Sequence, residues 1–185
     1  MGILRYAINV TLDGCCHHEA GLLPDAESMR YWTDMIEGAR ALLYGRVTYE
    51  MMRDAWRRPA SGPWPEWMDA EEQAFAHVID AARKHVVTSS STDLGWNAER
   101  VEGDLAASVR RLRDETDGMI LVGGVTLPAA LADAGLIDEY VFVVQPVVAG
   151  LGPTLLAGLR ERMTLQLIDR RDFSSGAVAL RYRPA

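Results

Sequence analysis

The sequence predicts one α/β domain with three layers, a mainly parallel mixed sheet with helices on both faces and a C-terminal antiparallel hairpin. Strand-like and helix-like segments alternate as far as residue 135, which is typical of a parallel sheet whose strands are joined by covering helices. The last third is strand-rich, and Ser174-Ser175-Gly176 separates its final two strands, which favours a hairpin at a sheet edge. A chain of 185 residues suffices for one such core, so we expect residues 1–185 to form a single domain.

Short apolar or alternating segments predict the strands of the parallel part, at residues 3–10, 41–44, 85–88 and 119–122. Apolar residues at helical spacing predict the intervening helices: 26–37, a short one after Arg46, 69–82, one from Leu105, and one carrying Leu127 to Ala134. Asp25 and Asp104 are placed to cap two of these helices, and Gly135 suits the end of the last. A proline-rich loop without regular structure is expected over 57–65.

The C-terminal strands are expected at 139–148, 164–172 and 177–182. The first of them carries many apolar residues for a strand near a sheet edge: Val141, Val143, Val147 and Val148. Exposed apolar edges promote pairing with another chain. We therefore expect a homodimer built partly from these strands.

Composition restricts the classes of partner. A formal net charge of −7 argues against nucleic acid, because no basic surplus exists to displace counterions from a phosphate backbone. No apolar run approaches the roughly 20 residues that span a bilayer, so no membrane partner is expected. The N-terminus lacks the basic-then-apolar layout of a signal peptide, and a cytoplasmic setting is the expectation.

Four potential metal ligands stand in a row, Cys15-Cys16-His17-His18. Zinc sites space their ligands so that the chain can wrap around the ion, and adjacent side chains point in different directions. We expect no metal here. The simplest interpretation is a mobile loop that tolerates small and polar residues, while His17 and His18 as proton donors are an alternative.

Two strand–helix junctions suggest phosphate binding. The apolar run at 119–122 ends in Gly123-Gly124 and passes into a helix, and Gly45-Arg46 follows the strand at 41–44 in the same way. Helix N-termini present unpaired N–H groups, and glycine lets a phosphate approach them. Neither junction matches G-x-G-x-x-G or the P-loop pattern, so the argument rests on the combination. Two such turns suggest a dinucleotide, bound beyond the carboxyl ends of the strands.

The order of motifs resembles the dihydrofolate reductase-like fold, and more closely stand-alone relatives of the C-terminal reductase domain of bacterial riboflavin biosynthesis. The segments that carry this resemblance cover nearly the whole chain: Thr11-Leu12-Asp13-Gly14, Gly45-Arg46-Val47-Thr48-Tyr49-Glu50, Val87-Thr88-Ser89, Val122-Gly123-Gly124, Pro146 to Pro153, and Phe173-Ser174-Ser175-Gly176. Each segment alone has low specificity, but six in this order make the match fairly specific.

The resemblance implies NADPH as the hydride donor. It places Gly45, Arg46 and Thr48 at the cofactor's phosphates, Thr88, Ser89 and Ser90 at its adenosine phosphate, and Gly123, Gly124, Val125 and Thr126 under its pyrophosphate. The residue types agree, because a 2′-phosphate favours an arginine fork with hydroxyl donors.

The substrate end departs from the family patterns. Dihydrofolate reductases carry a carboxylate at the start of the first helix, and neither Asp25 nor Glu27 aligns convincingly with it. Asp13 is the best polar candidate beside the nicotinamide, with a turn-forming role as the alternative. Trp56 and Trp64 are candidates to wall the substrate site, with plain packing as the alternative.

The sequence thus favours an NADPH-dependent reductase resembling 5-amino-6-(5-phosphoribosylamino)uracil reductase, with its physiological substrate open. The H-x-E and P-C-x-x-C signature of the zinc deaminase domain that often accompanies this enzyme is missing, so deamination is excluded. The alternatives are a non-catalytic nucleotide-binding homodimer and a weak dihydrofolate reductase.

Overall fold

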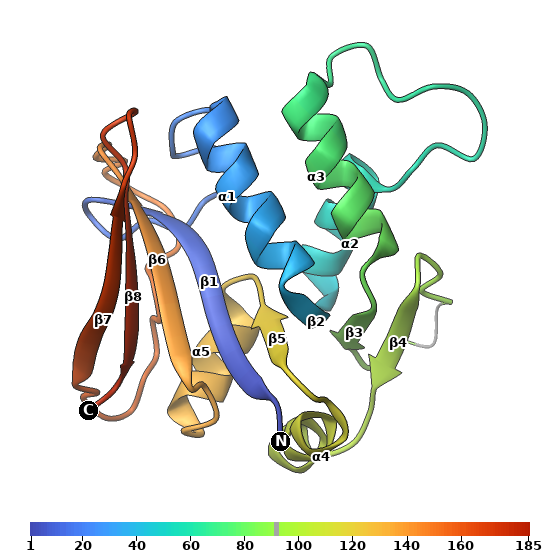
Figure 1. Ribbon diagram of the computed structural model, residues 1–185. Helices are drawn as coiled ribbons and strands as arrows, with labels where there is room; N and C mark the ends of the chain where they lie inside the picture. The colour runs from blue at the N-terminus through green and yellow to red at the C-terminus, as the bar shows by residue number, and fades with distance from the viewer. Residues whose placement is uncertain (91–92) are drawn as a thin grey trace.

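One sheet organises the protein in the computed structural model, which describes residues 1–90 and 93–185 (Figure 1). Its strands are β1 (Ile3–Thr11), β2 (Ala39–Gly45), β3 (Lys84–Val87), β4 (Ala98–Val101), β5 (Met119–Val122), β6 (Glu139–Gln145), β7 (Leu165–Asp172) and β8 (Val178–Pro184). The order across the sheet is β4-β3-β2-β5-β1-β6-β8-β7. The pairs from β4 to β6 are parallel, whereas β8 runs antiparallel to both β6 and β7.

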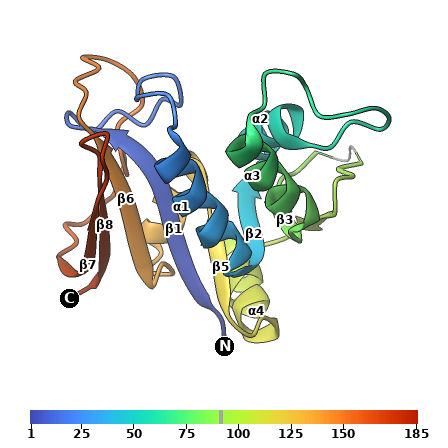
Figure 2. The same ribbon diagram turned by 45° about the horizontal axis from the view of Figure 1, so that its top comes forward.

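Helices cover both faces of this sheet. They are α1 (Ala26–Glu37), α2 (Arg46–Trp56), α3 (Ala70–Ala81), α4 (Leu105–Glu115) and α5 (Thr126–Asp133). One core packs α1, α2 and α3 against one face, and a second core packs α4 and α5 against the other. In Figures 1 and 2, α1 and α3 lie in front of the central strands and α5 lies behind them. The predicted three-layer fold with its C-terminal hairpin is confirmed.

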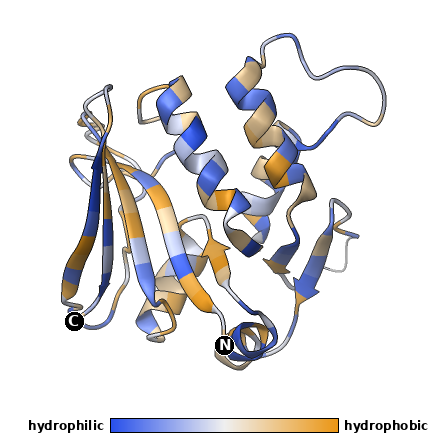
Figure 3. Ribbon diagram, in the orientation of Figure 1, coloured by the Kyte–Doolittle hydropathy of each residue, from blue (hydrophilic) through white to orange (hydrophobic). Residues whose placement is uncertain are grey.

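The central strand β5 shows why the sheet is covered twice. Ile120 and Val122 are completely buried in the core on the α4 and α5 side, while Leu121 is buried in the core on the α1 side. Both faces of such a strand must leave water, so its sequence is apolar throughout. Figure 3 shows this strand in hydrophobic colours, beside helices that alternate between the two colours.

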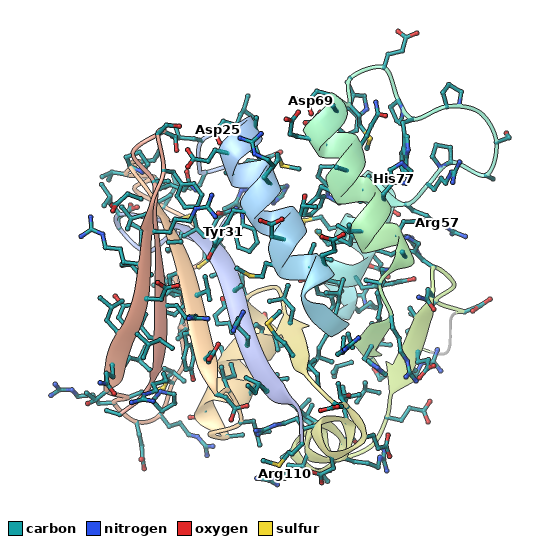
Figure 4. All side chains as sticks on the ribbon, viewed as in Figure 1. Asp25, Tyr31, Arg57, Asp69, His77 and Arg110 are labelled. Carbon is teal, nitrogen blue, oxygen red and sulfur yellow. The ribbon has the colours of Figure 1, made fainter. Side chains whose placement is uncertain are left out.

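Aspartates begin three of the helices. Asp25 and Asp69 each accept a hydrogen bond from the backbone N–H three residues on, and the side chain at that position returns the bond. Both residues lie at the upper ends of α1 and α3 in Figure 4. Asp104 caps α4 through the N–H of Ala107. The predicted starts after Asp25 and Asp104 are confirmed, and Asp69 lies at the cap rather than inside its helix.

Two features of the sheet differ from the sequence-based expectation. The strand β4 was not expected, and β6 ends at Gln145 rather than near residue 148. Moreover, β6 lies between β1 and β8, and Val141 and Val143 are buried within the chain itself. The apolar character of β6 therefore reflects its interior position, and the argument that based a homodimer on it was wrong. The homodimer itself stays a prediction.

Helix length bears on membrane contact. None of the helices in the described part of the chain combines the length and the apolar character that crossing a bilayer requires.

The only lysine of the chain, Lys84, is completely buried at the start of β3. Its Nζ donates hydrogen bonds to the carbonyls of Ala82 at 2.7 Å and Asp80 at 3.3 Å. It also lies 4.0 Å from the centre of the Trp96 ring. Burial lowers the pKa of Lys84 to about 8, because removal from water disfavours the charged amine, and the Asp80 carboxylate opposes this shift.

We expect the stability of the protein to rise between pH 8 and pH 10, because the folded amine has lost its proton while the unfolded one still binds it. The rise is about 1 kcal/mol per pH unit. Lys84→Met should remove this rise, whereas Arg83→Met, next to it and exposed, should keep it. Urea unfolding across this range measures both slopes. An equal slope in Lys84→Met and the native protein would contradict the assignment.

Candidate functional site

The carboxyl ends of four neighbouring parallel strands, β3, β2, β5 and β1, lie at one edge of the sheet. The strands do not end together. Val122, the last residue of β5, pairs with Tyr6, whereas β1 continues to Thr11. The edge of β1 that faces β5 is thus free of a strand partner beyond Tyr6. Ligands of open parallel sheets bind at such a place.

Two helices begin at this edge without a capping side chain. Gly45 lies at the N-cap of α2 and Val125 at the N-cap of α5, and neither gives a side-chain hydrogen bond to the first turn. The other three helices carry aspartate caps. A carboxylate cap would occupy the terminal N–H groups and repel an anion. The uncapped starts of α2 and α5 are therefore the helix N-termini that can receive phosphate.

Glycine allows these two helix starts to lie against each other. Gly124 has φ +99°, in the region that favours glycine, and a Cβ added there would collide with Oγ1 of Thr48 in α2. A Cβ on Gly123 would lie 2.7 Å from the Tyr44 ring of β2. A side chain at position 124 would collide with α2, and one at position 123 would collide with the Tyr44 ring of β2. Gly124 is therefore the residue that lets the start of α5 lie against α2.

A cavity of about 660 Å³ opens beside the start of α2. Its lining comes from the first residue of α2 and from the ends of β3 and β4: Arg46, Val87, Thr88, Ser89, Arg100, Val101, Glu102 and Gly103. The Arg46 side chain is about half exposed and forms an ion pair with Glu50 at 2.8 Å. Two guanidinium groups and two hydroxyls around one cavity provide the donors that a phosphate monoester requires.

The structure brings the sequence-predicted cofactor residues to one edge in two groups. Arg46, Thr88 and Ser89 line the cavity. The second group lies at the α2–α5 contact: Gly45, Thr48, Gly123, Gly124, Val125 and Thr126. Ser90 is not among the cavity's lining residues, and its N–H donates to Oγ1 of Thr88 at 3.1 Å. The binding roles of these residues stay predictions.

Sequence reasoning missed Arg100, which lines the same cavity from β4. The strand itself was missed because Ala98-Glu99-Arg100-Val101 is short and charged. Charged side chains are common on edge strands, where they discourage pairing with other chains. The available signal was Gly95, which precedes two residues in left-handed conformation and marks a turn into a new strand.

Asp13 joins two loops rather than pointing into the cavity beside Arg46. Its carboxylate accepts hydrogen bonds from the Thr11 hydroxyl at 2.5 Å and from the N–H groups of Ala149 at 3.1 Å and Gly150 at 2.7 Å. These bonds, led by that from Thr11, lower the pKa of Asp13 to about 2. An ionised carboxylate has no proton to donate at neutral pH. The geometry therefore favours a loop-connecting role over the predicted catalytic one.

The two tryptophans proposed as substrate walls pack within the protein. The Trp56 ring lies 4.6 Å from that of Phe75, in an edge-to-face arrangement. Trp64 donates from Nε1 to His77 at 3.2 Å, and His77 is labelled on the outer side of α3 in Figure 4. Neither tryptophan is among the residues that line the cavity beside Arg46. The Trp56 contact joins α2 to α3, the Trp64 contact joins the loop after α2 to α3, and a substrate role stays a prediction.

The Cys-His run divides into buried and exposed parts. Cys15 and Cys16 are buried free thiols, and burial raises the pKa of Cys16 to about 11. His17 and His18 are exposed, with their rings stacked at 4.8 Å. Across residues 1–90 and 93–185, no three His, Cys, Asp or Glu side chains are grouped as a metal site requires.

Both acids near the start of α1 have structural partners. Asp25 caps the helix through Ser28. Glu27 accepts hydrogen bonds from the N–H of Ser174 at 2.9 Å and from its hydroxyl at 2.8 Å, and so connects α1 to the β7–β8 turn. The Ser28 and Ser174 hydrogen bonds lower the pKa of Asp25 and of Glu27 respectively. Neither carboxyl holds a proton at neutral pH.

Comparison with protein families identifies the class of protein that this fold and edge define. The family model of the RibD C-terminal domain matches residues 3–179. The chain therefore belongs to the RibD C-terminal domain family, the reductase family of riboflavin biosynthesis. Among curated proteins, it is 27% identical over 180 residues to the uncharacterized protein YyaP of Bacillus subtilis, covering 94% of this chain and 90% of that protein.

Solved structures share the fold. A putative riboflavin biosynthesis protein from Shewanella sp. PV-4 superposes with a TM-score of 0.73 at 16% identity, covering 99% of both chains. A diaminohydroxyphosphoribosylaminopyrimidine deaminase/5-amino-6-(5-phosphoribosylamino)uracil reductase from Thermotoga maritima gives 0.68 at 17% identity, over 99% of this chain and 56% of that one. The expected resemblance to the reductase domain is confirmed.

We expect Asp13→Asn to lower the melting temperature and to increase protease cleavage of the 147–152 loop. The amide replaces one acceptor oxygen with a donor, which faces the N–H of Ala149 or Gly150. In the native protein the ionised Asp13 contributes stability above pH 4, which is lost as the pH falls towards 2. This loss of stability between pH 4 and pH 2 should be absent from Asp13→Asn.

Asp114→Asn provides the matched control, since Asp114 is exposed on α4 and its loss should change neither property. Thermal melts between pH 2 and pH 7, with limited proteolysis, measure both variants. An Asp13→Asn protein indistinguishable from Asp114→Asn would refute the loop-connecting role.

Proposed function

We propose that this protein is an NADPH-dependent reductase of the riboflavin biosynthesis type, acting on a phosphoribosylaminouracil-like acceptor. The observation that carries the proposal is the pair of uncapped helix N-termini, α2 and α5, held together at Gly124 beside a cavity with two arginines. Family membership supplies the reaction class.

The residues present fit the cofactor. Because Gly124 lacks a Cβ, Thr48 of α2 can lie against the start of α5, and the N–H groups of both first turns supply donors for a pyrophosphate. Arg46, Arg100 and Ser89 line the cavity that suits the 2′-phosphate. Bound NADPH supplies a hydride. The chain's own contribution is to bind the phosphates and to orient the nicotinamide end towards β1.

The alternatives are a non-catalytic nucleotide-binding homodimer and a weak dihydrofolate reductase. The first would bind NADPH without oxidising it for any acceptor. The second requires a carboxyl group to assist protonation of the pterin, and both nearby acids, Asp25 and Glu27, are held ionised by structural hydrogen bonds. These contacts favour the riboflavin-type reductase.

We expect the native protein to bind NADPH more tightly than NADH, and Arg46→Ala to weaken NADPH by tenfold to a hundredfold while NADH changes little. A lost charge-assisted hydrogen bond costs about 1.5–3 kcal/mol, which corresponds to this range. Arg100→Ala should act in the same direction. Fluorescence titration of the native protein and both variants with NADPH and with NADH gives the six dissociation constants.

Arg110→Ala is the control, because it removes the same charge from an exposed position on α4 (labelled in Figure 4) that is not among the residues lining the cavity. It should leave both affinities unchanged. Equal affinities of the native protein for NADPH and NADH would disprove the 2′-phosphate assignment.

We expect NADPH oxidation with 5-amino-6-(5-phosphoribosylamino)uracil to exceed that with dihydrofolate by about a hundredfold or more. General acid assistance contributes roughly 10²–10⁴ in rate, and no protonated carboxyl among the described candidates is available to a pterin. Assays of NADPH oxidation with each acceptor under the same conditions show which of the two is reduced faster. Turnover of dihydrofolate alone would reverse the proposal, and NADPH binding without either turnover would support the non-catalytic alternative.

A further inference from the structure

Two side-chain amides meet at the carboxyl edge of the sheet. Asn9 of β1 and Gln145 at the end of the neighbouring β6 are joined by a hydrogen bond of 3.3 Å from Nε2 of Gln145 to Oδ1 of Asn9. Asn9 is exposed, while Gln145 is 7% exposed. Gly21 packs against the Gln145 side chain. A Cβ added to Gly21 would lie 3.3 Å from Cγ of Gln145. A buried amide thus holds an exposed one.

Asn9 lies on the face of the sheet that α1 covers. Side chains alternate along a strand, so Asn9 shares its face with Ala7, which packs in the α1 core. Ala7 is buried and Asn9 is exposed, so the part of this sheet face that other elements cover ends between the two residues. Asn9 also belongs to the part of β1 beyond Tyr6, where β5 has ended and Gly123-Gly124 follow. It therefore lies at the edge where the proposed cofactor site is found.

The pair has a fixed hydrogen-bonding capacity. One bond between two amides uses one N–H and one carbonyl oxygen, whichever way the two groups are turned. Because an amide has two N–H groups and two carbonyl lone pairs, Asn9 itself keeps at least one N–H and one carbonyl lone pair to contact a ligand in either orientation. A neighbouring donor and acceptor are complementary to a lactam edge, in which a ring N–H stands next to a C=O.

We propose that Asn9, positioned by Gln145, is the specificity-determining residue that recognises the lactam edge of the heterocyclic acceptor, an inference that rests on the proposed reductase function. Asn9 contacts the heterocycle, and Gln145 acts through Asn9. A site built around such polar groups disfavours analogues that leave them unpaired. The same chemistry occurs in the carboxamide of nicotinamide, so the test must separate the acceptor from the cofactor.

Calorimetric binding of 5-amino-6-(5-phosphoribosylamino)uracil and of its N3-methyl derivative, with NADP⁺ present to prevent turnover, provides this test. Methylation removes the ring N–H. The native protein should bind the methylated compound at least tenfold more weakly. Asn9→Ala should bind the parent compound about tenfold more weakly and should no longer distinguish the two. Gln145→Met should reduce the discrimination in part, because Asn9 remains without its positioning partner.

Gln166→Ala, which removes an exposed amide from β7, is the matched control and should keep full discrimination. A structural defect would weaken the binding of both compounds equally and preserve the ratio of their dissociation constants. A native-like ratio in Asn9→Ala therefore overturns the proposal. If Asn9→Ala loses affinity for NADPH but not for 2′-phospho-ADP-ribose, which lacks the nicotinamide, then Asn9 contacts the nicotinamide and the proposal is overturned too. A native protein that binds NADPH but not the uracil overturns this inference together with the proposed acceptor and leaves the NADPH-dependent reductase class standing, whereas one that binds neither overturns the proposed function as a whole.

Discussion

The close approach of Gly124 to Thr48 is the constraint on which the candidate site depends. It lets α5 begin against the first turn of α2, so that two sets of unpaired N–H groups face one region. The positive φ at Gly124 and the contact at Gly123 with Tyr44 both exclude a larger side chain. A dinucleotide carries charge on several phosphates, and two neighbouring helix starts offer N–H donors to more than one of them.

Local chemistry made much of this predictable from the sequence. Asp25 and Asp104 mark helix starts because a carboxylate satisfies N–H groups that the helix leaves unpaired, and both predictions are confirmed. The Gly-Gly junction and the glycine before Arg46 indicated the site for the same local reasons. The order of the strands was not predictable, because the sequence of β6 does not show whether it pairs with one strand, as at a sheet edge, or with two, as in the sheet interior. Its valines indicated burial correctly and edge position wrongly.

The roles that the sequence missed or left open depend on contacts between distant segments. Arg100 reaches the cavity only because β4 pairs with β3, and its own strand is short and charged. For Asp13 the sequence left two roles open, beside the nicotinamide or in a turn, and in the structure its carboxylate accepts a hydrogen bond from a loop 136 residues away in the sequence. A turn-forming Asp-Gly pair looks the same in sequence whether its carboxylate binds a loop or a ligand. Such roles become visible only when the partner's position is known.

The electrostatics of the edge limit the chemistry further. Asp13, Asp25 and Glu27 all accept backbone and hydroxyl hydrogen bonds, and all three have lowered pKa values. None of these three acids lines the cavity beside Arg46, whose charged lining consists of Arg46, Arg100 and Glu102, with Arg100 and Glu102 forming an ion pair at 3.5 Å. Hydride transfer to a carbonyl or a ring-opened sugar leaves an oxygen that water can protonate. A pterin, whose ring nitrogen needs an acid at the moment of transfer, is the less suitable acceptor for such an edge.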